Sequence, residues 1–186
     1  MATERDDPMQ MDELQRMLRQ VERSVFRLET LSSYTAPGEA DLLRDFREGL
    51  PLPPRGPEND PWLQMVADSV QAGRRWSRVH VLSRPLSDYL RFELLGYHGN
   101  VAAGEDVRIA DRAIAADELG GLTCDFWLLD DVLAVKMVYD GEGRRVAMVP
   151  TSDVATFIQQ RDLAMTYSVA LQGYLPSVRH ELRRSW

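Results

Sequence analysis

The chain has 186 residues, of which 44% are hydrophobic and 27% are charged, and its formal net charge is -7. That length suffices for one well-buried domain and is short for two. The acidic balance argues against direct nucleic-acid binding, because contacts to phosphates need a basic surface. The single cysteine, Cys124, excludes an internal disulfide and a cysteine-based metal cluster.

The fold class follows from the alternation of helical and strand patterns, which predicts a single α/β domain with a mixed central sheet flanked by helices. Residues 1–10 are expected to be disordered, residues 11–175 to form the domain, and residues 176–186 to form a C-terminal helical tail. The start, MATERDDP, is unlike a signal peptide, and no apolar run reaches the length of about 18 residues that a membrane span requires. We therefore expect a cytoplasmic protein that does not contact a membrane.

The first third of the chain predicts helix, strand, helix and connector. An apolar stripe of helical spacing is formed by Leu14, Met17, Leu18, Val21 and Val25. Residues 26–31, FRLETL, favour a strand, with a continued helix as the alternative. A short helix is predicted over residues 38–48 with Gly49 ending it, and residues 50–61, LPLPPRGPENDP, predict an extended connector.

The centre of the chain is residues 79–93, VHVLSRPLSDYLRFE, which read as a core strand, a polar turn and the start of a helix. Asp60 is predicted to cap a helix over residues 61–73 that leads to this strand. Ser87 is predicted to cap the helix that follows, and residues 98–100, HGN, are expected to break the structure. The face of that helix toward the sheet is expected to carry Leu86, Leu90, Leu94 and Tyr97.

The following segment predicts most of the remaining sheet. Residues 106–110 predict a short strand and residues 111–122 a loop. The most apolar run is residues 125–140, DFWLLDDVLAVKMVYD, which predicts inner strands with a tight turn at Asp130 and Asp131. The hairpin MVYDGEGR is also expected to be internal and to lead into a returning strand over residues 145–149.

The last part of the chain predicts helices. Ser152 or Asp153 is expected to cap a long helix. Its inward face is expected to carry Val154, Phe157, Ile158, Met165 and Val169. A short terminal helix or a partner-binding stripe is predicted from Val178, Leu182 and Trp186.

A binding site is predicted at the polar turn between Ser83 and Arg91. Arg84 precedes a proline and is held extended, and Arg91 lies one helical turn beyond Ser87. Two guanidiniums near a helix N-terminus suit a carboxylate or phosphate, carried by an anionic small molecule or by an acidic segment of a partner. The candidate ligand-binding or partner-binding residues are Arg84, Ser87, Asp88, Tyr89, Arg91, Glu93, Asp125 and Asp130.

The sequence predicts no catalytic residue, no metal site and no cofactor. It lacks the motifs GxSxG, HExxH, GxxxxGK[ST] and GxGxxG, and its three histidines have no adjacent nucleophile. His80 is interpreted as a packed or surface strand residue. Asp130 and Asp131 could bind a cation together with Asp125 or Glu93, but turn chemistry is the preferred interpretation.

Several motifs together resemble an actinobacterial domain family that has no established activity: FRLETLSSY, PLSDYLRFE, NVAAGEDVRI, DFWLLDD and MVYDGEGR. The resemblance covers roughly residues 20–175. Members of that family are often encoded near helix-turn-helix regulators and small accessory proteins. The resemblance therefore implies a regulatory context and a protein partner of one of those kinds.

The predicted order of elements also resembles one half of a phospholipase D-type domain, whose motif is HxKxxxxD. With Asp130 at the position of the motif's aspartate, Asp125 replaces the lysine and Thr123 replaces the histidine. The resemblance then implies a non-catalytic relative that does not hydrolyse phosphodiesters. We therefore predict a non-catalytic regulatory or binding module. The alternative is a hydrolase or nuclease of unrecognised type that uses Asp88, Arg91, Glu93, Asp125 and Asp130.

Overall fold

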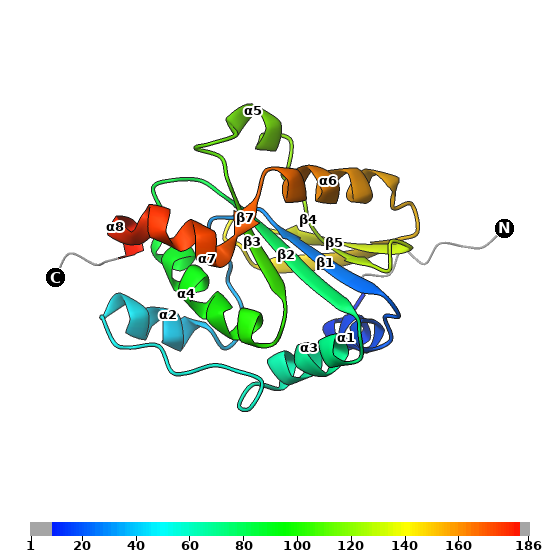
Figure 1. The fold of residues 1–186 in the computed structure, drawn as a ribbon, viewed down its shortest axis with the longest axis horizontal. Coiled ribbons are helices and arrows are strands. Elements are labelled where there is room, and N and C mark those ends of the chain that lie inside the picture. Colours follow the sequence, from blue (N-terminus) through cyan, green and yellow to red (C-terminus); the bar gives the residue numbers. More distant parts are fainter. Residues whose placement is uncertain (1–8, 183–186) are drawn as a thin grey trace.

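A computed structural model describes residues 9–182, which form a seven-stranded mixed sheet covered by helices on both faces (Figure 1). The strands are β1 Ser24–Glu29, β2 Arg75–Leu82, β3 Asp106–Asp111, β4 Asp125–Leu129, β5 Leu133–Tyr139, β6 Arg145–Thr151 and β7 Val169–Ala170. Their order across the sheet is β6-β5-β4-β1-β2-β3-β7. The adjacent strands β1, β2 and β3 are parallel to one another, and each remaining pair is antiparallel.

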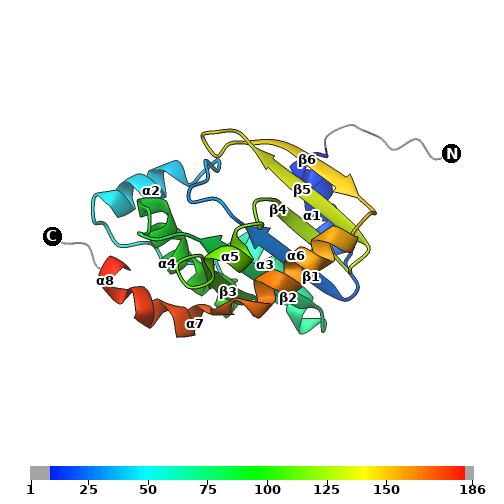
Figure 2. The ribbon, with the colours of Figure 1, turned by 90° about the horizontal axis from the view of Figure 1, so that it is seen from above.

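The helices lie in two layers that sandwich the sheet. They are α1 Met11–Arg19, α2 Ala40–Arg47, α3 Pro61–Gln71, α4 Asp88–Ala102, α5 Ala116–Leu119, α6 Ala155–Thr166, α7 Leu171–Tyr174 and α8 Arg179–Leu182, with a 3-10 turn at Leu175–Val178. Helices α1 to α4 lie on one face, and α5 and α6 lie on the other (Figures 1 and 2). We call these the α4 face and the α6 face. The predicted α/β class and mixed central sheet are confirmed.

The two faces of the sheet differ in chemistry. Under α6 the core is apolar and includes Phe26, Leu28 and Phe126. On the α4 face, one apolar cluster lies beneath α1 and α3 and a second lies beneath α4. Between those two clusters the central strands carry buried charged residues.

Several predicted elements are confirmed with small shifts in their bounds. FRLETL contributes strand β1, the Pro-rich connector contains no regular element, and Asp60 caps α3 by accepting from the N–H of Trp62 at 2.8 Å. Ser87 caps α4 through a bond from the N–H of Leu90 at 3.0 Å. Asp130 and Asp131 form the tight turn between β4 and β5, with φ of 54° and 60°.

Helix α1 is shorter than predicted. It ends at Arg19, and Val25 belongs to β1, where it is paired with Trp76 and Leu129. Residues 1–8 of the segment expected to be disordered lie outside the described residues. Met9 does not fit that expectation, because its side chain is buried in the core and its N–H donates to the carbonyl of Met148 at 3.0 Å.

The prediction that residues 98–100 break the structure is wrong, because α4 continues through them to Ala102. Gly99 serves the packing of this helix and does not end it. A Cβ atom at Gly99 would lie 2.7 Å from the carbonyl oxygen of Arg55, so the connector can approach α4 only at a residue without a side chain.

Four further expectations are corrected. Residues 111–122 contain the short helix α5 and are not only a loop. The MVYDGEGR hairpin is not wholly internal, since β6 is an edge strand. Neither Ser152 nor Asp153 caps α6, because the N-cap position is Val154 and the N–H of Asp153 donates to the Thr151 hydroxyl. Val169 does not face inward: it lies in β7 and is 49% exposed.

The C-terminal segment packs against the domain. Val178 is buried with Leu171 and Tyr174 in the cluster beneath α4. Helix α8 follows at Arg179–Leu182, and Trp186 lies outside the described residues. None of the helices found between residues 9 and 182 has the length and apolar character needed to cross a membrane.

Candidate functional site

The ends of three central strands meet at one edge of the sheet. Glu29 ends β1, His80 lies near the end of the parallel strand β2, and Asp125 begins the antiparallel strand β4. From β1 the chain proceeds across the sheet to β2 and β3 and only later returns to β4 on the other side of β1. Such a reversal of strand order is where open α/β sheets place their ligands.

Five charged or titratable residues form what we call the central cluster: Arg27, Glu29, Arg78, His80 and Asp125. All five are buried on the α4 face. Arg27 lies 3.1 Å from Asp125 and 3.5 Å from Glu29, and Arg78 lies 2.9 Å from Glu29. Arg78 also pairs with the buried Glu105 at 3.0 Å. The guanidiniums and carboxylates therefore compensate one another within the fold.

Asp125 connects the cluster to the loop that follows β1. One carboxylate oxygen accepts bonds from the N–H and the hydroxyl of Thr30 at 2.8 and 2.7 Å. The other accepts from the hydroxyl of Tyr34 at 2.6 Å. This carboxylate therefore fixes the loop across the strand ends, which is a structural role for a residue predicted to belong to a binding site.

The hydroxyl of Tyr97 lies between His80 and Glu29 and donates its one proton to Glu29. Nε2 of His80 lies 3.0 Å from the carbonyl oxygen of Leu31, which can only accept, so Nε2 carries a proton. Nδ1 lies 2.8 Å from the hydroxyl of Tyr97, and that hydroxyl lies 2.8 Å from a Glu29 oxygen. Burial lowers the pKa of His80, which favours the neutral ring.

The positive and negative charges of the central cluster compensate one another. Burial alone would raise the pKa of Glu29, but Arg78 and Arg27 outweigh burial and hold it well below its usual value. The Arg27 guanidinium lies 5.2 Å from the ring centroid of Trp127, a cation–π contact, and its Nη1 is buried without a hydrogen-bond partner among the described residues. No group of acidic, histidine or cysteine side chains in residues 9–182 has a metal-binding arrangement.

A cavity of about 710 Å³, which we call the aromatic cavity, lies over the cluster on the α4 face. Glu29 and Arg78 belong to its lining. Six aromatic side chains line it as well: Tyr34, Trp62, Tyr89, Tyr97, Trp127 and Tyr139. The rings of Trp62 and Trp127 lie 5.8 Å apart, and those of Tyr34 and Tyr139 lie 5.2 Å apart. Aromatic walls over a charged floor suit an organic molecule with both apolar and polar parts.

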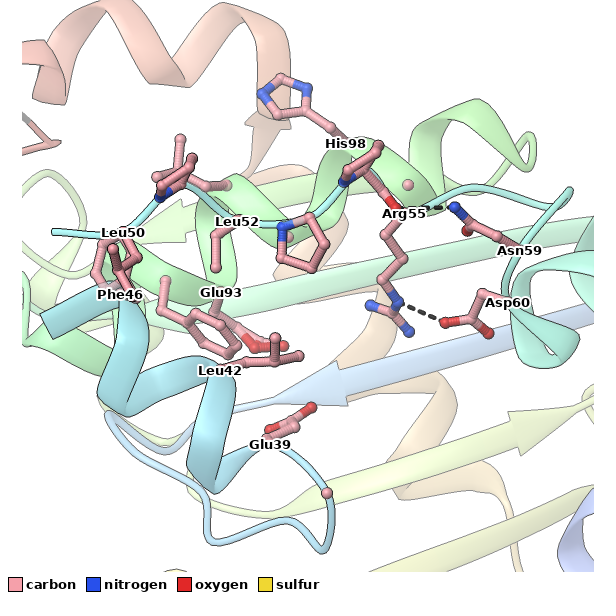
Figure 3. A pocket seen from close by; sticks show the side chains of 18 of the residues that line it. Glu39, Leu42, Phe46, Leu50, Leu52, Arg55, Asn59, Asp60, Glu93 and His98 are labelled. Carbon is pink, nitrogen blue, oxygen red and sulfur yellow. Dashed lines mark hydrogen bonds and ion pairs between the residues drawn. The ribbon is translucent and has the colours of Figure 1, made fainter. Parts of the chain in front are cut away.

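A second cavity, which we call the apolar groove, runs between α2, α4 and the Pro-rich connector and has a volume of about 1100 Å³. Its apolar lining includes Leu42, Phe46, Leu50, Leu52, Phe92 and Leu95. The two cavities share Pro37, Gly38, Glu39, Arg55 and Glu93 in their linings. In Figure 3, Glu39, Arg55 and Glu93 point from the start of α2, the connector and α4 toward the same space.

Glu93 is the least compensated of the acidic residues at this junction. Its Oε2 is out of contact with solvent and has no hydrogen-bond partner among the described residues. Burial, followed by the negative charges of Glu29 and Glu39, raises the pKa of Glu93 to about 8. A carboxyl group that is largely protonated at neutral pH and borders both cavities is characteristic of a functional site.

The predicted anion site at the start of α4 is filled by the protein itself. Glu181 of α8 accepts bonds from the Arg84 guanidinium, including Nε at 2.6 Å, and from the N–H of Leu86 at 2.7 Å. Arg91 also contacts this segment, donating to the carbonyl of Glu181 at 3.4 Å. The anion bound here is therefore an intramolecular carboxylate, whereas the sequence predicted an anion from a ligand or a partner.

The other predicted residues divide between three places. Arg91 and Asp88 pair with each other at 2.6 Å on α4. The buried Tyr89 donates its hydroxyl to Glu39 at 3.1 Å, next to Glu93 and the two cavities. Asp130 lies at the far end of β4 from Asp125 and accepts from the backbone N–H groups of Glu22, Arg23 and Ser24. Of the predicted residues, Tyr89 lines the aromatic cavity and Glu93 lines both cavities.

Sequence reasoning missed most of the cavity floor and walls. The missed residues include Arg27, Glu29, Tyr34, Glu39, Arg55, Trp62, Arg78, Tyr97, Trp127 and Tyr139. Charged residues at alternate positions of two strands, Arg27 and Glu29 in β1 and Arg78 with His80 in β2, were the available signal. A second signal was their position in strands whose other residues are apolar.

The fold and the cavities thus define a mixed α/β domain with a polar, aromatic-lined site above the ends of its central strands. Residues 12–176 match the sequence profile of a family described as Domain of unknown function (DUF6879), and the chain belongs to this family. A comparison with curated proteins found no match. The expected membership of a domain family without an established activity is confirmed.

Proposed function

We propose that this domain is a non-catalytic binding module that holds a small organic molecule in the aromatic cavity and the adjoining apolar groove. The observation that carries the proposal is the aromatic-lined cavity of about 710 Å³ above the mutually compensated central cluster. Cavities of this size with aromatic walls are typical of small-molecule sites. In the central cluster the charged side chains form ion pairs with one another, which favours a binding role over a catalytic one.

The hydrolase or nuclease alternative needs its five residues in one place. Asp88 and Arg91 pair with each other on α4, whereas Asp125 and Asp130 lie at opposite ends of β4. This separation favours the binding proposal. A phospholipase D-type relationship, a cytoplasmic location and a helix-turn-helix regulator or small accessory protein as partner remain parts of the proposal that rest on the sequence alone.

Native mass spectrometry after incubation with a small-molecule extract of bacterial cells tests the proposal. Gly96 lies in α4 and lines the apolar groove, and a Cβ atom there would meet no atom within 4 Å. Gly96→Leu should therefore occupy the groove and remove the added mass seen with the unaltered protein. Gly96→Ala is the matched control, since it favours the helix and leaves most of the space open.

Two results would contradict the proposal. One is the absence of any added mass on the unaltered protein, and the other is equal binding by the protein with Gly96→Leu. Gly173→Leu supplies a second control, because Gly173 lies in α7 outside both cavities and a Cβ atom there also meets nothing within 4 Å.

A further inference from the structure

The charges at the junction of the two cavities are unevenly compensated. Glu39 and Glu93 form no ion pair with any residue in the described range 9–182, and the hydroxyl of Tyr89 is the group that donates to Glu39. The guanidiniums that line the same space are already paired. Arg55 binds Asp60 at 2.6 Å, and Arg78 binds Glu29 and Glu105.

A second observation concerns the carboxyl group of Glu93, which lacks a hydrogen-bond donor at one oxygen among the described residues. Its Oε2 is shielded from solvent and lacks a hydrogen-bond partner, although the residue borders both cavities. Leaving a buried carboxyl oxygen without a donor costs folding free energy, so a donor supplied by a ligand would recover that cost. A cationic donor would also relieve the repulsion between Glu93 and its acidic neighbours.

The two cavities that meet at this junction indicate which chemical groups a ligand would carry on either side of Glu93. The groove beside Glu93 is lined by Leu42, Phe46 and Phe92, which suits an aliphatic chain. The aromatic cavity on the other side places tyrosine and tryptophan rings where a cation is favoured. Arg144 and Arg145 also line the aromatic cavity, but Arg144 pairs with Asp140 and Glu142, and Arg145 is exposed.

We propose that the ligand is an organic amine, with its ammonium group between Glu93 and Glu39 and its apolar body in the apolar groove. This inference rests on the proposed binding function and names the chemical class that the site selects. The ammonium donates hydrogen bonds to the two carboxylates, and the proton of Glu93 is released to solvent when the cation binds. Since the pKa of Glu93 is raised to about 8, most of the unliganded protein carries that proton at pH 7.

Isothermal titration calorimetry at pH 7 with octylamine, octanol and octanoate tests the inference. A charge-assisted hydrogen bond should make octylammonium bind about tenfold more tightly than octanol, with octanoate weakest. Titrations in phosphate and in HEPES buffer should show the release of close to one proton per octylammonium bound. Glu93→Gln should lose both the tenfold preference and the proton release while still binding octanol.

The controls separate this inference from the binding function. Glu118→Gln, at an exposed position of α5 on the α6 face, should leave the preference and the proton release unchanged. Preferential binding of octanoate, or octylammonium binding without proton release, would overturn the amine assignment. Failure of all three probes would overturn it too, and the extract experiment with Gly96→Leu would then show whether a different molecule binds.

Discussion

The two faces of the central sheet are both buried, yet they are built from different chemistry. In β1, Phe26 and Leu28 enter an apolar core beneath α6, whereas the alternate residues Arg27 and Glu29 enter an ion-pair network on the α4 face. Burial on the α6 face is favourable for each residue taken alone. On the α4 face each charge is tolerated only because its partners are present. We therefore expect the faces to respond differently to small and large substitutions.

The largest effects are expected from two adjacent residues of β4 that lie on opposite faces. Trp127 packs against Trp62, Trp76 and the Arg27 guanidinium, and Phe126 packs against Phe26 and Phe157. Trp127→Ala and Phe126→Ala should each lower the free energy of unfolding by about 3 to 5 kcal/mol. Chemical denaturation measures both. An unchanged midpoint for Trp127→Ala would contradict its place in the core.

Substitutions that nearly conserve side-chain volume should distinguish the stability costs on the two faces of the sheet more clearly. Glu29→Gln removes the charge that compensates Arg27 and Arg78 and should cost about 2 to 3 kcal/mol. Leu28→Met, at the next residue on the α6 face, should cost less than about 1.5 kcal/mol. Equal costs from denaturant titrations would mean that the central cluster is not an interdependent network.

The pH dependence of the free energy of unfolding should reveal the raised pKa of Glu93. Its pKa is raised to about 8 in the folded protein, so the folded state binds more protons than the unfolded state between the ordinary glutamate pKa and pH 8. This contribution is fully present below the ordinary glutamate pKa and is lost as pH rises toward 8. Relative to Glu93→Gln, the unaltered protein should lose several kcal/mol of unfolding free energy over that interval.

Thermal or denaturant unfolding at pH 5 and pH 8.5 compares the two proteins. An identical pH dependence would contradict the raised pKa. Glu118→Gln, at an exposed position on the α6 face, again serves as the control and should keep the pH dependence of the unaltered protein.

The smallest effect is expected at an ion pair outside the buried network. Arg161 of α6 pairs with Asp131, whose side chain is 43% exposed. Arg161→Ala should change the free energy of unfolding by less than about 1 kcal/mol, because solvent screens such pairs. A loss as large as that of Glu29→Gln would remove the distinction between buried and exposed charges.

The sequence predicted which residues of a strand share a face and did not reveal that both faces are buried. The alternation of Val79 and Val81 with Arg78 and His80 correctly indicated β2. The same alternation occurs in strands with one solvated face, so it does not distinguish water from an ion-pair network on the polar side. Solvent is excluded from Arg78 and His80 only because α4 and the loop after β1 pack over them.

The candidate site was predicted in part for a similar reason. The turn chemistry at Ser87 and at Asp130 is local, and both assignments are confirmed. Arg84 was predicted to meet an anion of a ligand or partner, and in the structure it binds the carboxylate of Glu181, 97 positions further along the chain. No local pattern carries that pairing, since it depends on how the C-terminal helices return to the sheet.

The sequence by itself determined the α/β class, most of the strands, the caps of α3 and α4 and the tight turn of β4–β5, because these depend on short-range periodicity and backbone preference. The tertiary structure alone decided the cavities. Glu39, Arg55 and Glu93 come from separate elements and face one space only after the connector packs on Gly99 of α4. Burial and the charges of neighbouring strands then set the protonation of Glu93, and both are properties of the folded chain.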